Sequence, residues 1–136
     1  MKGGYGGKDL WIVKKEKRNK WSKPVNLGPA VNTSADEMFP FLHQDGSLYF
    51  SSNGHIGMGG HDIFKTSPDE NEAYSSVINL KFPVNSSSDD FGMIIESDGE
   101  RGFFTSNRKG GKGSDDVYAF ELPPLVIFAQ GVVTDS

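Results

Sequence analysis

The sequence predicts an all-β protein built from a repeated unit, and three observations support this prediction. A glycine-rich motif that ends in an aspartate followed by two apolar residues occurs three times, at Asp9, Asp62 and Asp116, so the period is 53 to 54 residues. The composition favours turns and strands over helices, with 17 Gly and 7 Pro among 136 residues. Short aromatic-rich runs alternate with Asp-Gly and glycine-rich turn signals. Repeats of this length are supersecondary units, each of which buries its apolar face only against a neighbour.

The repeat extends over two separate blocks of sequence. The glycine-rich motif reads Gly6-Gly7-Lys8-Asp9-Leu10-Trp11, then Gly59-Gly60-His61-Asp62-Ile63-Phe64, then Gly113-Ser114-Asp115-Asp116-Val117-Tyr118. The second block repeats at an offset of 53 and maps Asn26-Leu27, Val31-Asn32, Ser34, Asp36 and Asp45-Gly46 onto Asn79-Leu80, Val84-Asn85, Ser87, Asp89 and Asp98-Gly99. One residue inserted in the second turn then shifts the offset to 54, so that Ser51-Ser52-Asn53 aligns with Thr105-Ser106-Asn107.

Each unit is expected to contain two hairpins. In the first unit, Leu10 to Val13 is followed by the charged run Lys14 to Lys20, which we interpret as a solvated hairpin tip before Trp21. In the second unit, strands are expected at 37–42, 48–52, 62–66 and 76–80, with a turn at Asp45-Gly46 and a polar connection at 67–72. In the third unit, strands are expected at 91–95 and 102–106 around Asp98-Gly99, with a third strand before Pro123-Pro124.

These strands amount to the outer hairpin of one unit, a complete second unit and three strands of a third. Four short antiparallel strands per unit are typical of a β-propeller blade, and a ring needs about four to eight blades, or on the order of 210 to 420 residues at this period. We therefore predict that residues 1–124 are a partial β-propeller of about two and a half blades, a fragment of a larger propeller. Its open blade faces would be covered by self-association, by the rest of a larger chain or by other proteins.

The double proline at 123–124 is predicted to end the repeat, because proline supplies no ladder donor. The following run, Leu125 to Val133, is strongly β-prone. It is either the fourth strand of the last blade or the first strand of another domain. We favour the second interpretation, with 125–136 as a linker and first strand, because no polar hairpin like residues 67–72 precedes the run.

Composition excludes several classes of function. The chain has no cysteine, so disulfides and thiol chemistry are ruled out. No apolar stretch approaches the roughly 20 residues of a membrane span, so we expect no membrane insertion. The net charge is -4, although residues 1–23 hold eight Lys or Arg against two acids. The acidic remainder would repel phosphate and no stacking platform accompanies the basic run, so no nucleic-acid partner is expected.

The two linked motifs resemble a known family of repeats. Residues 39–53 and 57–64 are similar to the WD-like propeller repeat of the TolB type, in the variant found in periplasmic OmpA-family proteins of Bacteroidota, including the PorE-like component of the type IX secretion system. The resemblance covers residues 3–122. It implies a location in the periplasm, associated with the outer membrane. It also implies a carboxypeptidase-regulatory-like β-sandwich after the propeller, which 125–136 would open, and a peptidoglycan-binding domain that is absent from this chain.

The resemblance implies a non-enzymatic scaffold that binds protein partners of a cell-envelope complex, the secretion machinery. Peptidoglycan would be bound only through the absent domain. The alternative is a glycan- or peptide-binding, or hydrolytic, propeller. The inner strands at 38–42 and 91–95 are mostly apolar, whereas such chemistry needs convergent carboxylates.

No catalytic, cofactor-binding or metal-binding residue is predicted. The glycine-rich motif supplies one carboxylate per copy, fewer than calcium collects, so its aspartate is expected to accept backbone N–H bonds. The doubled Asp115-Asp116 is where a cation would be sought. Gly110 to Ser114 lacks the order of a phosphate loop. His43, His55 and His61 align with Glu96, Lys109 and Asp115, so they are assigned to the surface.

Serine chemistry is not expected either, because Ser51-Ser52 and Thr105-Ser106 lack the glycine-flanked nucleophile elbow. The aromatic residues at equivalent positions of the repeats are expected to form the core between units rather than a binding surface. They are Trp11, Phe64 and Tyr118 at one position, and Phe50 and Phe104 at another.

Overall fold

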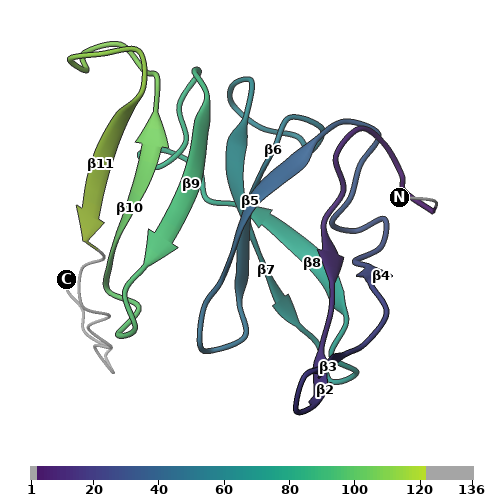
Figure 1. The fold of residues 1–136 in the computed structure, drawn as a ribbon. Helices are drawn as coiled ribbons and strands as arrows, with labels where there is room; N and C mark the ends of the chain where they lie inside the picture. The colour runs from purple at the N-terminus through teal and green to yellow at the C-terminus, as the bar shows by residue number, and fades with distance from the viewer. Residues whose placement is uncertain (1–2, 122–136) are drawn as a thin grey trace, which may run out of the picture.

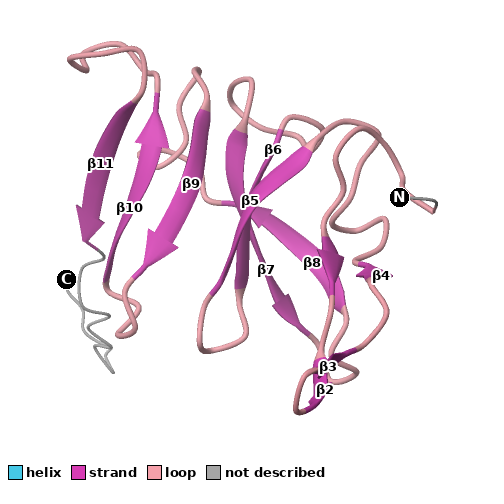
Figure 2. Cartoon of the chain, in the orientation of Figure 1, coloured by secondary structure: helices cyan, strands magenta, loops and turns pink. Residues whose placement is uncertain are grey.

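The protein is an all-β chain in which every paired strand is antiparallel to its neighbour. The computed structural model describes residues 3–121, and these form eleven strands and no helix (Figure 2). The described part of the chain therefore contains no helix that could span a lipid bilayer. The sheets follow one another along the chain, from the first hairpins through a four-stranded sheet to a three-stranded sheet (Figure 1).

The strands fall into the three expected groups. The first unit holds β1 (Trp11–Ile12), β2 (Lys15–Lys17), β3 (Lys20–Trp21) and β4 (Val25–Asn26), paired as β1-β4 and β2-β3. The second holds β5 (Glu37–Leu42), β6 (Leu48–Ser52), β7 (Asp62–Pro68) and β8 (Tyr74–Asn79) in one sheet of that order. The third holds β9 (Asp90–Ile95), β10 (Arg101–Ser106) and β11 (Asp116–Glu121), again as neighbours in sequence order.

The predicted all-β class and the predicted order of strands are confirmed. The third strand of the second unit runs two residues further than expected, to Pro68, and the fourth begins earlier, at Tyr74. The register of this pair shifts between Thr66 and Pro68, which is where a proline without an N–H is tolerated in a sheet. The predicted strand at 125–136 and the last residues of the range 1–124 lie outside the described residues.

The Asp-Gly turns form for a local reason that is the same in both copies. Gly46 and Gly99 have φ of +93° and +77°, values that an L side chain rarely adopts. The aspartate before each glycine accepts the N–H two residues further on, at 2.8 Å for Asp45 with Ser47 and at 2.8 Å for Asp98 with Glu100. Each turn is therefore stabilised by its own aspartate, which accepts the N–H, and by its own glycine, which adopts the positive φ.

The first strands of the four-stranded and the three-stranded sheet, β5 and β9, carry the same bulge. The register of β5 against β6 shifts between Met38 and Phe41, and Phe39 inside the shift has φ of +55°. Its equivalent 53 residues later, Gly92, has φ of +69°. Phe39 holds this unfavourable conformation while its ring stacks on Phe91 of the next unit at 5.1 Å between centroids. The bulge thus brings neighbouring inner strands into contact.

Two apolar clusters lie on opposite faces of the four-stranded sheet. The first junction, between the first unit and this sheet, buries Leu10, Val31, Leu48, Phe50 and Phe64, with Leu27, Tyr74 and Val77 at its margin. The second junction, between this sheet and the third, buries Tyr49, Ile63, Met93, Ile95 and Phe104, with Phe41, Leu80, Val84, Tyr118 and Phe120 at its margin. Neighbouring residues of a strand point to opposite faces, so Tyr49 and Phe50 serve different junctions.

The two junctions are built from equivalent residues. Leu10, Leu27 and Val31 of the first junction correspond to Ile63, Leu80 and Val84 of the second, at an offset of 53. The stacked pair Phe50–Phe64, 5.9 Å between ring centroids, corresponds to Phe104–Tyr118 at 5.7 Å. This confirms that Phe50, Phe64, Phe104 and Tyr118 form the core between units. Trp11, the third residue predicted at the position of Phe64 and Tyr118, belongs to neither cluster and is only partly buried.

A buried asparagine stabilises each junction from the loop that leads into the next unit. Asn85 Oδ1 accepts the N–H of Ile63 at 2.7 Å, and Asn85 Nδ2 donates to the carbonyl of Ile63 at 2.8 Å. Asn32 makes the same two bonds with Leu10, at 2.8 and 2.9 Å. Each asparagine therefore satisfies one buried N–H that has no other partner there, and it shares the C=O of the same residue with a backbone N–H 3.2 Å away, that of Leu27 or Leu80.

Replacing this asparagine should be costly. In Asn85→Ala the buried N–H of Ile63 loses its partner, whereas the C=O of Ile63 keeps the N–H of Leu80. An unsatisfied buried group costs about 1 to 3 kcal/mol, so the free energy of unfolding should fall by about 1 to 3 kcal/mol. Urea unfolding followed by circular dichroism measures this. The control is the exposed substitution Ser75→Ala, with an expected effect within about 0.5 kcal/mol. Equal stability of the two variants would contradict the role assigned to Asn85.

Candidate functional site

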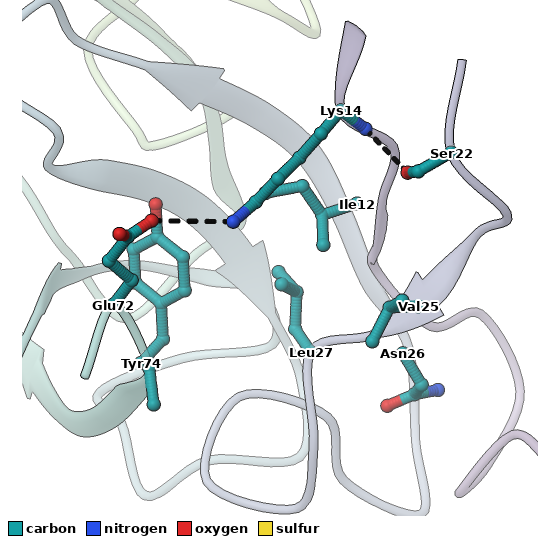
Figure 3. Close-up of a pocket in the computed structure, with 9 residues that line it drawn as sticks. Ile12, Lys14, Ser22, Val25, Asn26, Leu27, Glu72 and Tyr74 are labelled. Carbon is teal, nitrogen blue, oxygen red and sulfur yellow. Dashed lines mark hydrogen bonds and ion pairs between the residues drawn. The ribbon is translucent and has the colours of Figure 1, made fainter. Parts of the chain in front are cut away.

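The strongest candidate site is a pocket between the first unit and the β7–β8 hairpin of the four-stranded sheet. It encloses about 420 Å³, and its lining is mostly apolar (Figure 3). The side chains of Ile12, Val25, Leu27 and Tyr74 surround the hollow, and they come from β1, β4, the segment after β4 and β8. The walls of the pocket therefore come from segments that lie far apart in the sequence.

A charged pair closes one side of this pocket. Lys14 Nζ lies 3.3 Å from Glu72 Oε1, and both side chains are largely exposed (Figure 3). An exposed pair of this kind contributes about 0 to 1 kcal/mol, so it is a weak tether. Lys14 is the first residue of the charged run that we interpreted as a solvated tip. The rest of the run, in β2 and β3, is exposed as predicted.

The pocket continues into a second hollow of about 220 Å³ next to β5. The two hollows share Ile12, Leu27 and Tyr74, and the second also touches Trp11 on one side and Leu42 on the other. Together they form one channel, which we call the first-junction groove. Its lining consists of Leu10, Trp11, Ile12, Val25, Leu27, Pro40, Leu42, Leu48 and Tyr74, with Lys14, Ser22, Asn26, Glu72 and Ala73 at the outer end.

One side of the groove is a free strand edge. Among residues 3–121, β4 is the only strand that pairs with β1. The N–H of Leu27 donates to the carbonyl of Leu10 at 3.2 Å, which makes the opposed residues Trp11 and Asn26 a non-hydrogen-bonded pair. The N–H and C=O of Trp11 therefore point away from β4. In the four-stranded sheet the equivalent residue, Phe64, is paired on that side with Phe50 of β6.

The floor of the groove is uncovered, although its equivalent is buried. Leu42 is 58% exposed, whereas Ile95, at the same position of the next unit, is 7% exposed. Ile95 packs against the four-stranded sheet, which presents the inner hairpin β5–β6. The described residues supply no such hairpin at the first junction. Sequence reasoning missed this site, because each lining residue is an ordinary apolar residue of a predicted strand or loop.

The aspartates of the glycine-rich motif behave as predicted. Asp62 is buried, and its Oδ2 accepts the backbone N–H groups of Met58 and Gly59. Asp116 Oδ2 accepts the N–H of Gly113 at 3.1 Å. The glycines are needed for closeness, because a Cβ on Gly57 would lie 1.8 Å from Asp62 Oδ2. Within residues 3–121, no three His, Asp or Glu side chains gather as a metal site requires, Asp115-Asp116 included.

The surface assignment of the histidines is wrong for His43. This side chain is buried between the second and third units, and its Nε2 donates to the carbonyl of Glu96 at 3.0 Å while its Nδ1 lies 3.0 Å from Asp45 Oδ1. Position 96 is the equivalent of position 43, so the alignment compared two residues that contact each other. His55 and His61 are only partly exposed.

His55 has an unexpected counterpart in the next unit. It packs on the Phe50–Phe64 pair and donates from Nε2 to the carbonyl of Val31 at 2.7 Å. In the next unit Arg108 takes this place: its guanidinium lies 5.2 Å from the rings of both Phe104 and Tyr118 and donates to the carbonyl of Val84. Alignment by offset paired His55 with Lys109 instead, because the two loops are equal in length and Arg108 lies one position earlier.

Arg108 also neutralises a buried carboxylate. Its Nη2 lies 2.9 Å from Asp90 Oδ1, and Asp90 is fully buried. The equivalent residue Glu37 is likewise buried and accepts from Ser52 Oγ at 2.7 Å. Ser52 therefore helps to satisfy a buried carboxylate.

The environment of His43 favours its protonated form. The carbonyl of Glu96 and the side chain of Asp45 raise the pKa of His43 above its usual value of 6.5. The N–H of Ser47, followed by the imidazole, lowers the pKa of the Asp45 carboxyl to about 2. Both charges are therefore present together over a wide interval of mildly acidic pH, and this pair links the Asp-Gly turn of one unit to the equivalent turn of the next.

Comparison with known proteins adds no relative. No protein-family model matches this chain, and neither a curated protein nor a solved structure shows significant similarity to it.

The His43–Asp45 pair predicts a pH-dependent contribution to stability. Because the folded-state pKa of His43 is raised, its contribution is fully present below pH 6.5 and is lost as the pH rises through the folded-state pKa. The unfolding free energy lost in Asp45→Asn should therefore be larger at pH 5.5 than at pH 8.5. Proton NMR should also show a lower pKa for His43 in the variant. A loss that does not change between these pH values would contradict the assignment.

Proposed function

We propose that this chain is a propeller segment that serves as a non-enzymatic protein-interaction scaffold. In this proposal it belongs to a periplasmic, outer-membrane-associated protein of the OmpA family and is part of the type IX secretion machinery. The sheets are blades of a larger propeller, and the surfaces they leave open are the surfaces that bind protein partners.

The observation that carries the proposal is an open apolar face on the third sheet. Ile63 is 0% exposed because the third unit covers it, whereas its equivalent Val117 is 71% exposed. Phe103 and Ile94 are exposed in the same way, although their equivalents Tyr49 and Phe41 pack into the second junction. Within residues 3–121, this face therefore has the residues of a junction but no neighbour that covers them.

The contacts between units support a propeller arrangement. His43 bonds the carbonyl of Glu96 and Gln44 Nε2 donates to the carbonyl of Ser97 at 2.8 Å, so each residue contacts its own equivalent 53 positions later. The inner strands β5 and β9 also touch through Phe39 and Phe91. Units that meet through equivalent points and stay close along their inner strands fit blades placed around an axis.

The cellular assignment depends on the motifs. The hairpin at 39–53 and the glycine-rich segment at 57–64 resemble the OmpA-family repeat, and both form the turn and strand entrance that the resemblance implies. Loop tips between strands, such as residues 69–73 between β7 and β8, offer further contact surfaces.

A capture experiment tests the scaffold proposal. The chain is immobilised and exposed to a solubilised envelope extract from a Bacteroidota bacterium that uses type IX secretion, and captured proteins are identified by mass spectrometry. Wild type should enrich components of the secretion machinery, and Phe103→Asp should lose them because a charge then sits on the open face. Ile78→Asp, also at an exposed apolar position but on β8, is the control and should behave as wild type. Capture that is unchanged in Phe103→Asp would contradict the proposed surface.

A second candidate function is ligand binding, and the first-junction groove favours a peptide over a glycan. Its walls are largely aliphatic, with Tyr74 as an aromatic member and one exposed ion pair at the end. A fluorescence screen on the Trp21→Phe variant, with Trp11 in the groove as the reporter, should show no saturable response to peptidoglycan fragments or oligosaccharides. Tight glycan binding would reverse this order of preference.

A further inference from the structure

We propose that the loops at one end of the four-stranded sheet bind a segment of a protein partner that presents apolar side chains with carboxylates beside them. The binding surface, which we call the loop patch, consists of Ile56, Met58, Lys81 and Phe82. It adds a second contact surface to the proposed scaffold, and it does not depend on the open face of the third sheet.

The loop patch gathers large apolar side chains in solvent. Ile56 is 97% exposed, Phe82 is 73% exposed and Met58 is 45% exposed. A group of exposed apolar side chains around a hollow is a feature of surfaces that bind other molecules. The hollow here measures about 540 Å³ and is lined by Ile56, Gly57, Met58, Asn79, Lys81 and Phe82.

The loop patch lies where neighbouring units do not pack. Ser52 pairs with Asp62 and Phe64 pairs with Asn79, so the loops after β6 and β8 leave the same end of the sheet. The first unit and the third sheet pack on the two faces of this sheet, and residues of both are described. A unit that packs on a face does not cover the end of the sheet. The exposure of the patch therefore follows from the fold of the second unit.

The repeat does not require the apolar side chains of the loop patch. Residues that hold the sheets together recur between units, as Asn32 and Asn85 do, whereas the patch residues are replaced. The equivalents of Ile56 are Gly3 and Gly110, those of Met58 are Tyr5 and Lys112, and that of Phe82 in the first unit is Pro29. The patch is thus a property of the second unit alone, as expected of a contact surface.

Lys81 occupies a backbone conformation that favours glycine. Its φ is +62°, its N–H donates to Asn79 Oδ1 at 2.6 Å, and its carbonyl accepts the N–H of Asn85 at 2.9 Å. The first unit makes the same turn with Gly28, whose φ is +93° and whose N–H donates to Asn26 Oδ1 at 2.8 Å. A side chain at positive φ lowers stability, and glycine avoids this cost. A lysine kept at such a position indicates a use for its charge.

Hydrogen bonds hold the loop patch in place before a partner binds. The N–H of Met58 donates to the buried Asp62, and Asn79 Nδ2 donates to the carbonyl of Ile56 at 3.4 Å. The turn at Lys81 fixes the backbone next to Phe82. A surface that is already ordered loses little conformational entropy on binding.

The charge of the loop patch favours a partner that supplies carboxylates. Residues 53–60 and 79–84, which form the patch, contain no Asp or Glu, and Lys81 is exposed beside Phe82. Asp62 and Asp89 contact these loops, but both already accept backbone N–H groups. Complementary charge on a partner speeds association and selects among partners.

The same charge disfavours two other occupants. Lys109, which is exposed next to the Arg108 that donates to the carbonyl of Pro83 at 2.8 Å, adds a second positive charge at this end of the sheets. An isologous contact with a second copy sets each patch against itself and brings like charges together. An anionic membrane surface is repelled by the net charge of -4. The occupant that fits is an acidic, apolar protein segment.

Peptide selection on the full chain tests the loop patch. Short random peptides displayed on phage are selected on the immobilised protein, and the enriched sequences are synthesised with a fluorescent label. They should share an apolar core flanked by Asp or Glu, and anisotropy should show binding weakened at least tenfold in Phe82→Ser. Met58→Ser should also weaken binding. Tyr5→Ser is its matched control, because Tyr5 holds the same position of the first unit and is 49% exposed.

The variant Lys81→Gly separates binding from stability. Glycine adopts the positive φ without cost, so the melting temperature should be at or above that of wild type. Affinity for the acidic peptides should nevertheless fall several-fold, to the value measured for the same peptides with Gln in place of Glu and Asn in place of Asp. Added salt should weaken binding to wild type more than binding to Lys81→Gly. A lysine with a structural role alone would leave the affinity unchanged.

Several outcomes would overturn the proposal. These are a selection that enriches no peptide, enriched peptides that are basic or that bind Phe82→Ser as tightly as wild type, and unchanged affinity in Lys81→Gly. Binding to phosphatidylglycerol vesicles that Phe82→Ser abolishes would assign the patch to a membrane, and dimerisation abolished by Phe82→Ser would assign it to a second copy. Phe103→Asp, on the face of the third sheet, should bind the peptides like wild type, so the two surfaces are tested separately.

Discussion

The fold depends on the burial of one repeated set of side chains between neighbouring sheets. The Phe50–Phe64 pair against Leu10 and Val31 is such a set, and it recurs 53 to 54 residues later. No unit has a core of its own, because each sheet is covered only by what lies on its two faces. The four-stranded sheet is covered on both faces, and it therefore carries the stability of the described residues.

This constraint makes the two ends of the array different from its middle and from each other. The third sheet ends in an apolar face that repeats the face buried at the second junction. The first unit ends in a strand edge and a groove, because β1 lacks the neighbour that β7 has in β6. A face binds through side chains alone, whereas an edge also supplies main-chain hydrogen bonds. The two ends of the described residues therefore present surfaces of different kinds.

Much of the fold could be predicted from the sequence, because its signals are local. The Asp45-Gly46 turn and the period of the motif depend on residues within one unit. What could not be predicted depends on contacts between units. His43 is buried because Glu96 lies against it. Arg108 takes the place of His55 from one position earlier in a loop of equal length, and it bonds the equivalent carbonyl. The groove escaped prediction because its lining comes from separate segments that the fold brings together, although the sequence does predict that the first unit holds only its outer hairpin.

The buried polar groups explain why the units meet in one orientation. Apolar contact alone tolerates sliding between two sheets, but Asn32 and Asn85 each bond both the N–H and the C=O of a single residue. A shift by one residue would leave the buried N–H that the asparagine accepts without a partner, at about 1 to 3 kcal/mol. The bulge adds to this, since Phe39 accepts an unfavourable φ only where Phe91 is present to stack on it. The alignment of neighbouring units is therefore set by a few polar and aromatic contacts, and the apolar positions can vary between units. The buried acidic position varies as well, since it is Glu37 in one unit and Asp90, paired with Arg108, in the next.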